Sequence, residues 1–380
     1  MRIAYFNANL NRGQDGVTRC VHRMIDAALQ RGHTVTAVAS DTPTHDDGIP
    51  VHTVPSVVLP LQRNYRIAYP TARSFRAHLE TFRPDIIHVN SPCTLGYTAM
   101  QHARRAGIPV VATYHTHFPT YPSYYGLDAM QPVVWMLTRR FYNSVDRTFV
   151  PTRPIRDELD VAGIERLTYL PNGYDATLFN PSHRSETWRR RFGGGRNPIV
   201  LFVSRLVWEK DLRVLAEAEQ LLRARGSRHE LVIVGNGHAR TALANMLPHA
   251  HFLGYQQGRD LSEAFASSDV FAFPSTTETF GLVTLEAMAS GLAPVAASSG
   301  GALELIEDGI SGFHAAPKDA SDLAEKVSWL VEHDELRRHV ATQAVARARQ
   351  YEWSIVLDQL FHHYEDVIAH HVHRRHAHAA

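Results

Sequence analysis

Short runs of apolar residues alternate along this chain with longer stretches in which apolar positions recur every three to four residues. Clear apolar runs are Ile199–Val203 and Val270–Phe273, and such runs are typical of strands buried on both faces of a parallel sheet. Between the runs, segments such as Thr18–Arg31 and Gly96–Ala106 have the spacing of amphipathic helices. The alternation predicts an α/β protein made of parallel βαβ units.

The same pattern predicts individual elements and a division into two domains. First-half strands are expected at about Arg2–Asn7, Thr34–Ala39, Asp85–Val89, Pro109–Tyr114, Arg147–Val150 and Leu167–Leu170, with a further helix at Thr71–Phe82. The pattern resumes at Pro198, with strands near 231–234, 250–253, 270–273 and 293–297, and turns helical after Lys318. Proline and glycine cluster between 171 and 197, which marks a boundary. We expect domains at 1–172 and 173–353, and a last helix at about 354–370 with Ser354 as its N-cap.

Composition narrows the class of protein. A chain of 380 residues exceeds the usual size of a single core, so two domains are expected. The 39 Lys and Arg balance 38 Asp and Glu, which predicts no general attraction to nucleic acid. Cys20 and Cys93 are the only cysteines and indicate a reducing compartment. The sequence has neither the pattern of a secretory signal nor an apolar stretch of about 20 residues, so we predict a cytoplasmic location.

In the second half of the chain, the candidate binding residues lie just after the predicted strands. The run Glu278 to Glu286 joins a strand end, a glycine turn and a helix start, where the backbone N–H groups of Phe280, Gly281 and Leu282 can hold a phosphate. Arg205 and Lys210 follow the strand 199–203 and would supply permanent positive charge to a diphosphate. After the strand ending at Val234, Gly235 and Asn236 would let a base or ribose approach the backbone. Together these residues predict a sugar-nucleotide site.

These segments resemble the retaining glycosyltransferases of the GT-B fold, in the large family 4 type that includes bacterial mannosyl-, glucosyl- and sulfoquinovosyltransferases. The resemblance is carried by Ser204-Arg205-Leu206 with Lys210, Val234–Gly237, Phe252–Gly254, Pro274-Ser275, Glu278-x-Phe280-Gly281-Leu282 and Glu286–Gly291. It implies two Rossmann-like domains facing across a cleft, with the C-terminal helix returning to the N-terminal domain. It assigns Glu278 to sugar hydroxyls and charge placement and Glu286 to the ribose. Retention in this family is attributed to front-face attack, with the leaving phosphate as base.

The first half supplies further candidates through the same resemblance. His115 follows the strand 109–114 and matches the family residue that contacts the donor sugar and the reacting centre. His117 stands where relatives often carry aspartate and, with Tyr121 and Tyr124, is a candidate for the acceptor side. Gly16 matches one of the paired glycines that many members use near a phosphate, but Asp15 precedes it here. The alternative is that the histidines are ordinary loop residues in a chain with 24 of them.

Several alternatives remain open from the sequence. The resemblance favours GDP-mannose over UDP-hexoses as donor, a lipid or small glycan as acceptor, and no cofactor beyond the donor substrate. An epimerase or a non-catalytic sugar-nucleotide-binding protein would share the architecture. Segments 64–70, 121–127 and 133–137 would form an apolar, partly basic lip for an anionic membrane, although core packing explains them equally well. No Asp-x-Asp motif is present, which predicts a metal-independent enzyme. The histidine-rich segment 370–378 is expected to be a frayed tail rather than a metal site.

Overall fold

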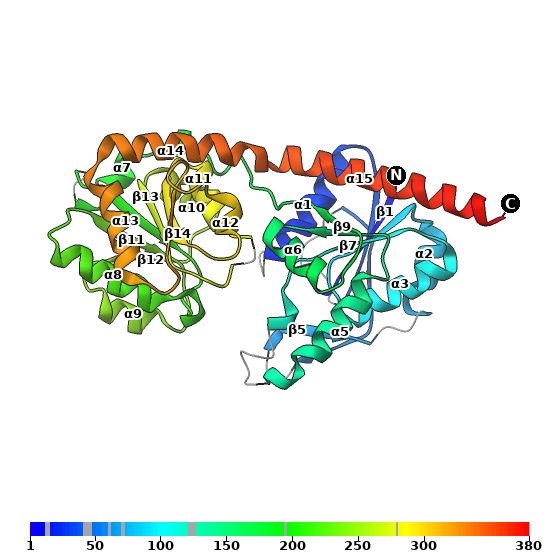
Figure 1. The fold of residues 1–380 in the computed structure, drawn as a ribbon. Helices are drawn as coiled ribbons and strands as arrows, with labels where there is room; N and C mark the ends of the chain where they lie inside the picture. The colour runs from blue at the N-terminus through cyan, green and yellow to red at the C-terminus, as the bar shows by residue number, and fades with distance from the viewer. Residues whose placement is uncertain are drawn as a thin grey trace. The chain divides into compact units, whose positions relative to one another are not determined.

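The computed structural model describes residues 1–11, 16–40, 48–59, 62–69, 73–120, 127–193, 196–278 and 280–379. It divides into two compact units, which are described separately. The N-terminal unit contains Met1–Pro171 together with Leu357–Ala380, and the C-terminal unit contains Asn172–Val356. Figure 1 shows that each unit is a twisted sheet covered by helices.

The N-terminal unit is built on a seven-stranded parallel sheet in the order β3-β2-β1-β6-β7-β8-β9. Its strands are β1 (Arg2–Asn7), β2 (Thr34–Ala39), β3 (Val51–Thr53), β6 (Ile86–Val89), β7 (Val110–Thr113), β8 (Arg147–Val150) and β9 (Leu167–Tyr169). Its helices include α1 (Gly16–Gln30), α2 (Arg73–Phe82), α3 (Thr94–Ala106), α5 (Gln131–Tyr142) and α6 (Arg153–Val161). A separate antiparallel hairpin pairs β4 (Ser56–Leu59) with β5 (Gln62–Ala68).

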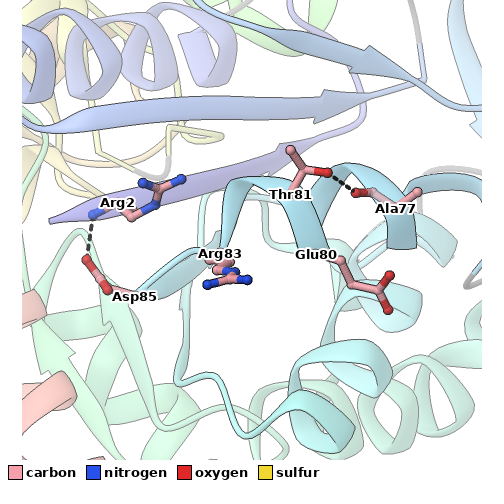
Figure 2. Close-up of a pocket in the computed structure, with 6 residues that line it drawn as sticks. All are labelled: Arg2, Ala77, Glu80, Thr81, Arg83 and Asp85. Carbon is pink, nitrogen blue, oxygen red and sulfur yellow. Dashed lines mark hydrogen bonds between the residues drawn. The ribbon is translucent and has the colours of Figure 1, made fainter.

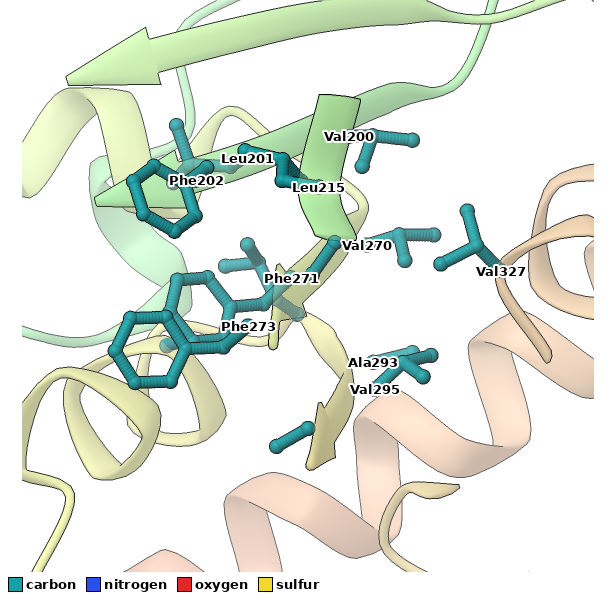
Figure 3. Packing of buried hydrophobic residues seen from close by; sticks show 14 of the residues in the cluster. Val200, Leu201, Phe202, Leu215, Val270, Phe271, Phe273, Ala293, Val295 and Val327 are labelled. Atoms are coloured by element: carbon teal, nitrogen blue, oxygen red, sulfur yellow. The ribbon is translucent and has the colours of Figure 1, made fainter. Parts of the chain in front are cut away.

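The C-terminal unit has a six-stranded parallel sheet in the order β12-β11-β10-β13-β14-β15. Its strands are β10 (Ile199–Val203), β11 (Glu230–Val234), β12 (His251–Gly254), β13 (Val270–Phe273), β14 (Ala293–Ala297) and β15 (Phe313–Ala315). Its helices include α8 (Leu212–Ala224), α9 (Arg240–Met246), α10 (Gly258–Ala266), α11 (Leu282–Ala289), α13 (Ala320–Glu332) and α14 (Asp334–Ala348). Figure 3 shows the phenylalanines of β10 and β13 stacked in the core. Both central strands are buried on both faces, as their continuous apolar runs predict.

The last helix, α15 (Trp353–Ala379), belongs to the N-terminal unit from Leu357 onwards. Asp358 of this helix pairs with Arg31 of the N-terminal unit, which agrees with the predicted return of the helix. Two expectations about this segment were wrong. The helix begins at Trp353, so Ser354 lies inside it and is not the N-cap, and helical structure runs through Ala379 where a frayed tail was expected.

The sequence pattern missed some of the shortest elements. The edge strands β3 and β15, with three residues each, were not predicted, whereas the equally short edge strand β9 was. The β4–β5 hairpin was also not predicted. Among the described residues, no helix combines the length and the apolar character needed to cross a membrane.

Candidate functional site

In the C-terminal unit, two of the predicted side chains meet in an ion pair. Lys210 ends the 3-10 turn after β10, and Glu278 lies in the loop after β13. The ammonium group of Lys210 donates to Oε1 of Glu278 and also lies 3.4 Å from the hydroxyl of Thr277. Both charged side chains are largely enclosed, with 13% and 23% of their surface exposed. The carboxyl ends of neighbouring strands β10 and β13 therefore carry one positive and one negative group in contact.

Hydrogen bonds from two neighbouring loops hold the backbone around Glu278. Asp211 follows Lys210, and its carboxylate accepts hydrogen bonds of 2.9 Å from both the N–H and the hydroxyl of Thr276. On the other side, Gly301 donates to the carbonyl of Glu278 at 3.1 Å. A Cβ atom on Gly300 would lie 2.0 Å from that same carbonyl oxygen, so only glycine fits there. The sequence reading missed both Asp211 and this glycine pair, although each directly follows a predicted strand or turn.

Arg205 and the loop after β11 form a second part of the C-terminal site. Arg205 is exposed, and its side chain makes no ion pair or hydrogen bond to another described residue, unlike that of Lys210. Gly235 follows β11, and it lies so close to Ser204, the residue after β10, that a Cβ atom would be 1.8 Å from the carbonyl oxygen of Ser204. Asn236 is exposed beside it, and its carbonyl accepts from Leu206 at 2.9 Å. Because Gly235 has no side chain, a ligand could approach the backbone closely at this position.

Helix α11 begins directly after this loop. Gly281 precedes it with φ of 85° and offers no side-chain cap. Its carbonyl accepts from the N–H groups of Thr284 at 2.9 Å and Leu285 at 3.1 Å, so the N–H groups that a side-chain cap would serve are those of Leu282 and Val283. The side chain of Phe280 is buried and packs against Tyr351, so only its backbone can take part in binding. Glu286 is 8% exposed. Most of this side chain, which the family resemblance assigns to the ribose, is therefore enclosed by the unit.

In the N-terminal unit, His115 lies just beyond β7. Its Nε2 is 3.3 Å from Oδ1 of Asn90, the residue that follows β6. Burial of the ring lowers the pKa of His115 to about 4, so the ring is neutral near pH 7. Asn90 is 1% exposed, and its amide nitrogen has no hydrogen-bond partner among the described residues. The sequence reading missed Asn90, which has the same signal as His115: a polar residue immediately after an apolar strand.

His117 has a different surrounding. Its Nδ1 lies 2.9 Å from the hydroxyl of Tyr114, its Nε2 lies 3.3 Å from a carboxylate oxygen of Glu158 on α6, and its ring meets Trp135 of α5 edge-on. Burial lowers the pKa of His117, and the charge of Glu158 opposes that shift. The side chain therefore joins the loop after β7 to two helices.

The other candidates contribute less. Gly16 is the first residue of α1, and the residues before it, 12–15, lie outside the described part of the chain. Tyr121 and Tyr124 also lie outside the described residues. In the part of the chain that the structure describes, no three His, Cys, Asp or Glu side chains are grouped as metal ligands would be.

A pocket of about 850 Å³ lies elsewhere on the N-terminal unit, as Figure 2 shows. Its lining residues are Arg2, Ala77, Glu80, Thr81, Arg83 and Asp85. Arg2 begins β1 and Asp85 precedes β6, so this pocket is at the amino ends of the strands. Open α/β sheets bind their ligands at the carboxyl ends, where Asn90 and His115 lie.

Two Rossmann-like domains with polar and charged groups at the carboxyl ends of their strands define the GT-B class of glycosyltransferases. Two family models match the chain: "Glycosyltransferase Family 4" over residues 14–178 and "Glycosyl transferases group 1" over residues 185–347. The chain belongs to glycosyltransferase family 4, and it is a glycosyltransferase.

Curated relatives agree with this assignment. A GDP-mannose-dependent alpha-mannosyltransferase of Mycobacterium tuberculosis is 36% identical, with 97% of each chain covered. A sulfoquinovosyl transferase of Arabidopsis thaliana is 35% identical over 73% of this chain and 56% of its own length. A phosphatidyl-myo-inositol mannosyltransferase of Mycobacterium tuberculosis is 28% identical over 93% of each chain.

Solved structures match the fold. Sucrose-phosphate synthase from Thermosynechococcus elongatus superposes with a TM-score of 0.80 at 20% identity, covering 97% of this chain and 99% of that chain. Agreement at this level of identity concerns the fold.

Proposed function

We propose that this enzyme transfers a mannosyl group from GDP-mannose to a lipid or small glycan acceptor and that the product keeps the α configuration. The observation that carries the proposal is the 36% identity, over 97% of both chains, to a GDP-mannose-dependent alpha-mannosyltransferase. UDP-glucose and UDP-sulfoquinovose are the competing donors.

In the proposed site, the diphosphate binds to the positive groups of the C-terminal unit. Arg205 is unpaired among the described residues, so it is available to a phosphate without loss of another contact. Leu282 and Val283 offer backbone N–H groups at the start of α11, which favour an anion. Lys210 adds a point charge, and Gly235 with Asn236 and Glu286 accommodates the nucleoside. These fixed groups stabilise the negative charge that develops on the leaving diphosphate.

In the proposed mechanism, the carboxylate of Glu278 pairs with Lys210 before the donor binds and contacts the sugar afterwards. Without donor, the two groups neutralise each other. An incoming phosphate competes for the ammonium of Lys210, and Glu278 is then released to accept hydrogen bonds from sugar hydroxyls. Its backbone stays fixed by Gly301 and by the packing of Gly300, so only the side chain turns.

His115 acts on the sugar as a neutral group. If Nε2 donates to Oδ1 of Asn90, the other ring nitrogen can only accept a hydrogen bond, for which a sugar hydroxyl is a suitable donor. A neutral imidazole also adds no positive charge beside an oxocarbenium-like sugar. Retention then follows from front-face attack, with the leaving phosphate taking the acceptor's proton.

The acceptor side is proposed from exposed apolar residues of the N-terminal unit. On α5, Met136 and Leu137 are each more than half exposed, and Arg139 and Arg140 lie in its last turn. On the β4–β5 hairpin, Val57 and Ile67 are 50% and 44% exposed. Apolar residues beside basic ones suit an anionic membrane surface. We therefore propose contact with the inner face of the membrane and a lipid acceptor, in line with the phosphatidyl-myo-inositol mannosyltransferase relative.

A donor screen tests the proposal. Calorimetry with GDP-mannose, UDP-glucose, UDP-sulfoquinovose and an ADP-sugar should give the tightest binding for GDP-mannose, and tighter binding of a UDP-sugar would replace the donor. Mass analysis after incubation with phosphatidylinositol-containing vesicles and with soluble glycans identifies the acceptor. Proton NMR of the isolated product then reads the linkage, and a β-linked sugar would reject retention.

A further inference from the structure

The two site residues at the carboxyl ends of β6 and β7 continue a line of polar residues inside the sheet. His88 and Asn90 are two positions apart, and so are Thr113 and His115, so each pair projects from one face of its strand. Asn90 donates its backbone N–H to Phe6, and Tyr114 donates to Phe149, so the strand pairing continues past the strand ends. We call His88, Thr113, Asn90, His115 and Tyr364 the polar ladder.

The lower rung of the polar ladder is fully buried. His88 is 0% exposed, and its Nε2 lies 2.8 Å from the hydroxyl of Thr113. Its Nδ1 lies 2.5 Å from the hydroxyl of Tyr364 on α15. Both partners are hydroxyls, which can donate or accept, so a neutral His88 is satisfied at both nitrogens in either tautomer. The hydroxyl of Tyr364 also lies 3.5 Å from that of Tyr5 on β1.

The upper rung is the contact between His115 and Asn90 described above. Burial first, and the neighbouring His115 second, lower the pKa of His88 to about 3, so both histidines are neutral near pH 7. The rungs are linked covalently as well, because Thr113 and His115 are separated by one residue. A change in the hydrogen bonds of His88 is therefore transmitted to the backbone that carries His115.

Aromatic packing fixes the ring of Tyr364 independently of its hydroxyl. The ring lies 5.7 Å from that of His88 at an interplanar angle of 88°, and it also packs against Phe149 and Phe361. The hydroxyl and the ring of Tyr364 therefore have separate contacts: the hydroxyl bonds to His88, and the ring packs in the core. A phenylalanine at this position keeps the ring contacts and removes only the hydrogen bond.

We propose that Tyr364 is a positioning residue for His115, acting through His88 and Thr113 to hold the imidazole of His115 in the orientation that receives the donor sugar. The inference rests on the proposed role of His115. Under this inference, the last helix contributes to turnover as well as covering the sheet of the N-terminal unit.

Turnover in a double-mutant cycle tests the inference. We compare the wild type, Tyr364→Phe, His115→Ala and the double variant by the rate of GDP release from GDP-mannose, with water as acceptor. Tyr364→Phe should lower kcat about tenfold, the size of one hydrogen bond to a buried group, and leave the affinity for GDP unchanged. In the His115→Ala background the same change should have almost no further effect, because the two residues act as one unit.

Tyr142→Phe is the matched control. Tyr142 is a buried tyrosine of the same unit, and in the part of the chain that the structure describes its hydroxyl has no hydrogen-bond partner. Removing that hydroxyl should leave kcat unchanged. A merely structural role of Tyr364 would instead lower the melting temperature and leave kcat per folded molecule at the wild-type value, with additive effects in the cycle.

A readout independent of the donor completes the test. Nitrogen NMR of the histidine rings gives this readout, with the His115 signal assigned by its loss in His115→Gln. The His115 signal should shift in Tyr364→Phe and should stay unchanged in Tyr142→Phe. An unchanged signal overturns the inference. If His115→Ala keeps full turnover, the proposed role of His115 fails and this inference fails with it. If His115→Ala is impaired but Tyr364→Phe is not, this inference fails alone.

Discussion

The two units hold their site residues by opposite means. In the C-terminal unit, Lys210 and Glu278 are charged and paired at the ends of two strands. In the N-terminal unit, His88 and His115 are buried enough to stay neutral. A site that binds a diphosphate needs charge, whereas one that faces a sugar ring needs hydrogen bonds without added charge. In the proposed mechanism, the charge that faces the diphosphate therefore comes from the C-terminal unit, and a neutral imidazole that faces the sugar comes from the N-terminal unit.

Removing the charged side of the comparison should have the largest effect. Lys210→Ala deletes the point charge beside the leaving diphosphate and is expected to lower kcat/KM by about 100-fold, measured with GDP-mannose. Lys326→Ala is the matched control, because Lys326 is paired with Asp322 on α13 of the same unit. Equal kinetics for the two variants would contradict the phosphate role of Lys210.

Glu278→Gln separates the two tasks of the ion pair. The amide no longer competes for Lys210, so the affinity for GDP alone should rise about threefold or more, while transfer falls at least tenfold because a sugar ligand is weakened. Calorimetry with GDP and turnover assays measure the two effects. Asp322→Asn breaks the Lys326 pair in the same way and should change neither. A loss of GDP affinity in Glu278→Gln would mean that the carboxylate does not oppose phosphate binding.

The neutral side of the comparison predicts a dependence of stability on pH. The pKa of His88 falls from its ordinary 6.5 to about 3 in the folded protein, so the unfolded chain binds more protons in that window. Its contribution to stability is present above pH 6.5 and is lost as the pH falls towards 3. His88→Gln should flatten the fall in unfolding free energy by up to about 1.4 kcal/mol per pH unit.

Urea unfolding at several pH values between these limits measures that slope. His238→Gln removes an exposed histidine of the C-terminal unit and controls for the loss of a titrating ring. A slope in His88→Gln equal to that of the wild type would show that folding does not shift the pKa of His88.

The smallest expected effect is that of a chelator. If Arg205, Lys210 and the start of α11 neutralise the diphosphate, turnover in excess EDTA should equal turnover without it. A strict need for Mg²⁺ or Mn²⁺ would mean that the protein's own positive groups are insufficient, and the charged half of the comparison would have to include a metal.

Sequence reasoning was strongest where burial is continuous. The strands at 2–7, 34–39, 147–150, 270–273 and 293–297 were predicted with their observed bounds, because a strand covered on both faces leaves an unbroken apolar run. Residues such as Lys210 and Glu278 were singled out because parallel strands bring their carboxyl ends to one edge. Their direct ion pair was not predicted, since side-chain contacts depend on how the loops pack.

The polar ladder shows where such reasoning ends. His88 lies within the apolar strand Ile86–Val89, where a single histidine gives no functional signal. Its partner Tyr364 is 276 residues away, and no local pattern connects the two. Asn90 could have been found by the strand-end rule that identified His115, whereas Tyr364 required the structure.

The path of the last helix has a consequence for biosynthesis. A ribosome makes the strands of the N-terminal unit first, and the sequence of the whole C-terminal unit is translated before Tyr364. While that synthesis continues, the nascent N-terminal unit holds His88 without the hydroxyl that pairs with it in the finished protein. Completion of the polar ladder is therefore a late event in biosynthesis, because Tyr364 follows the whole C-terminal unit in the chain.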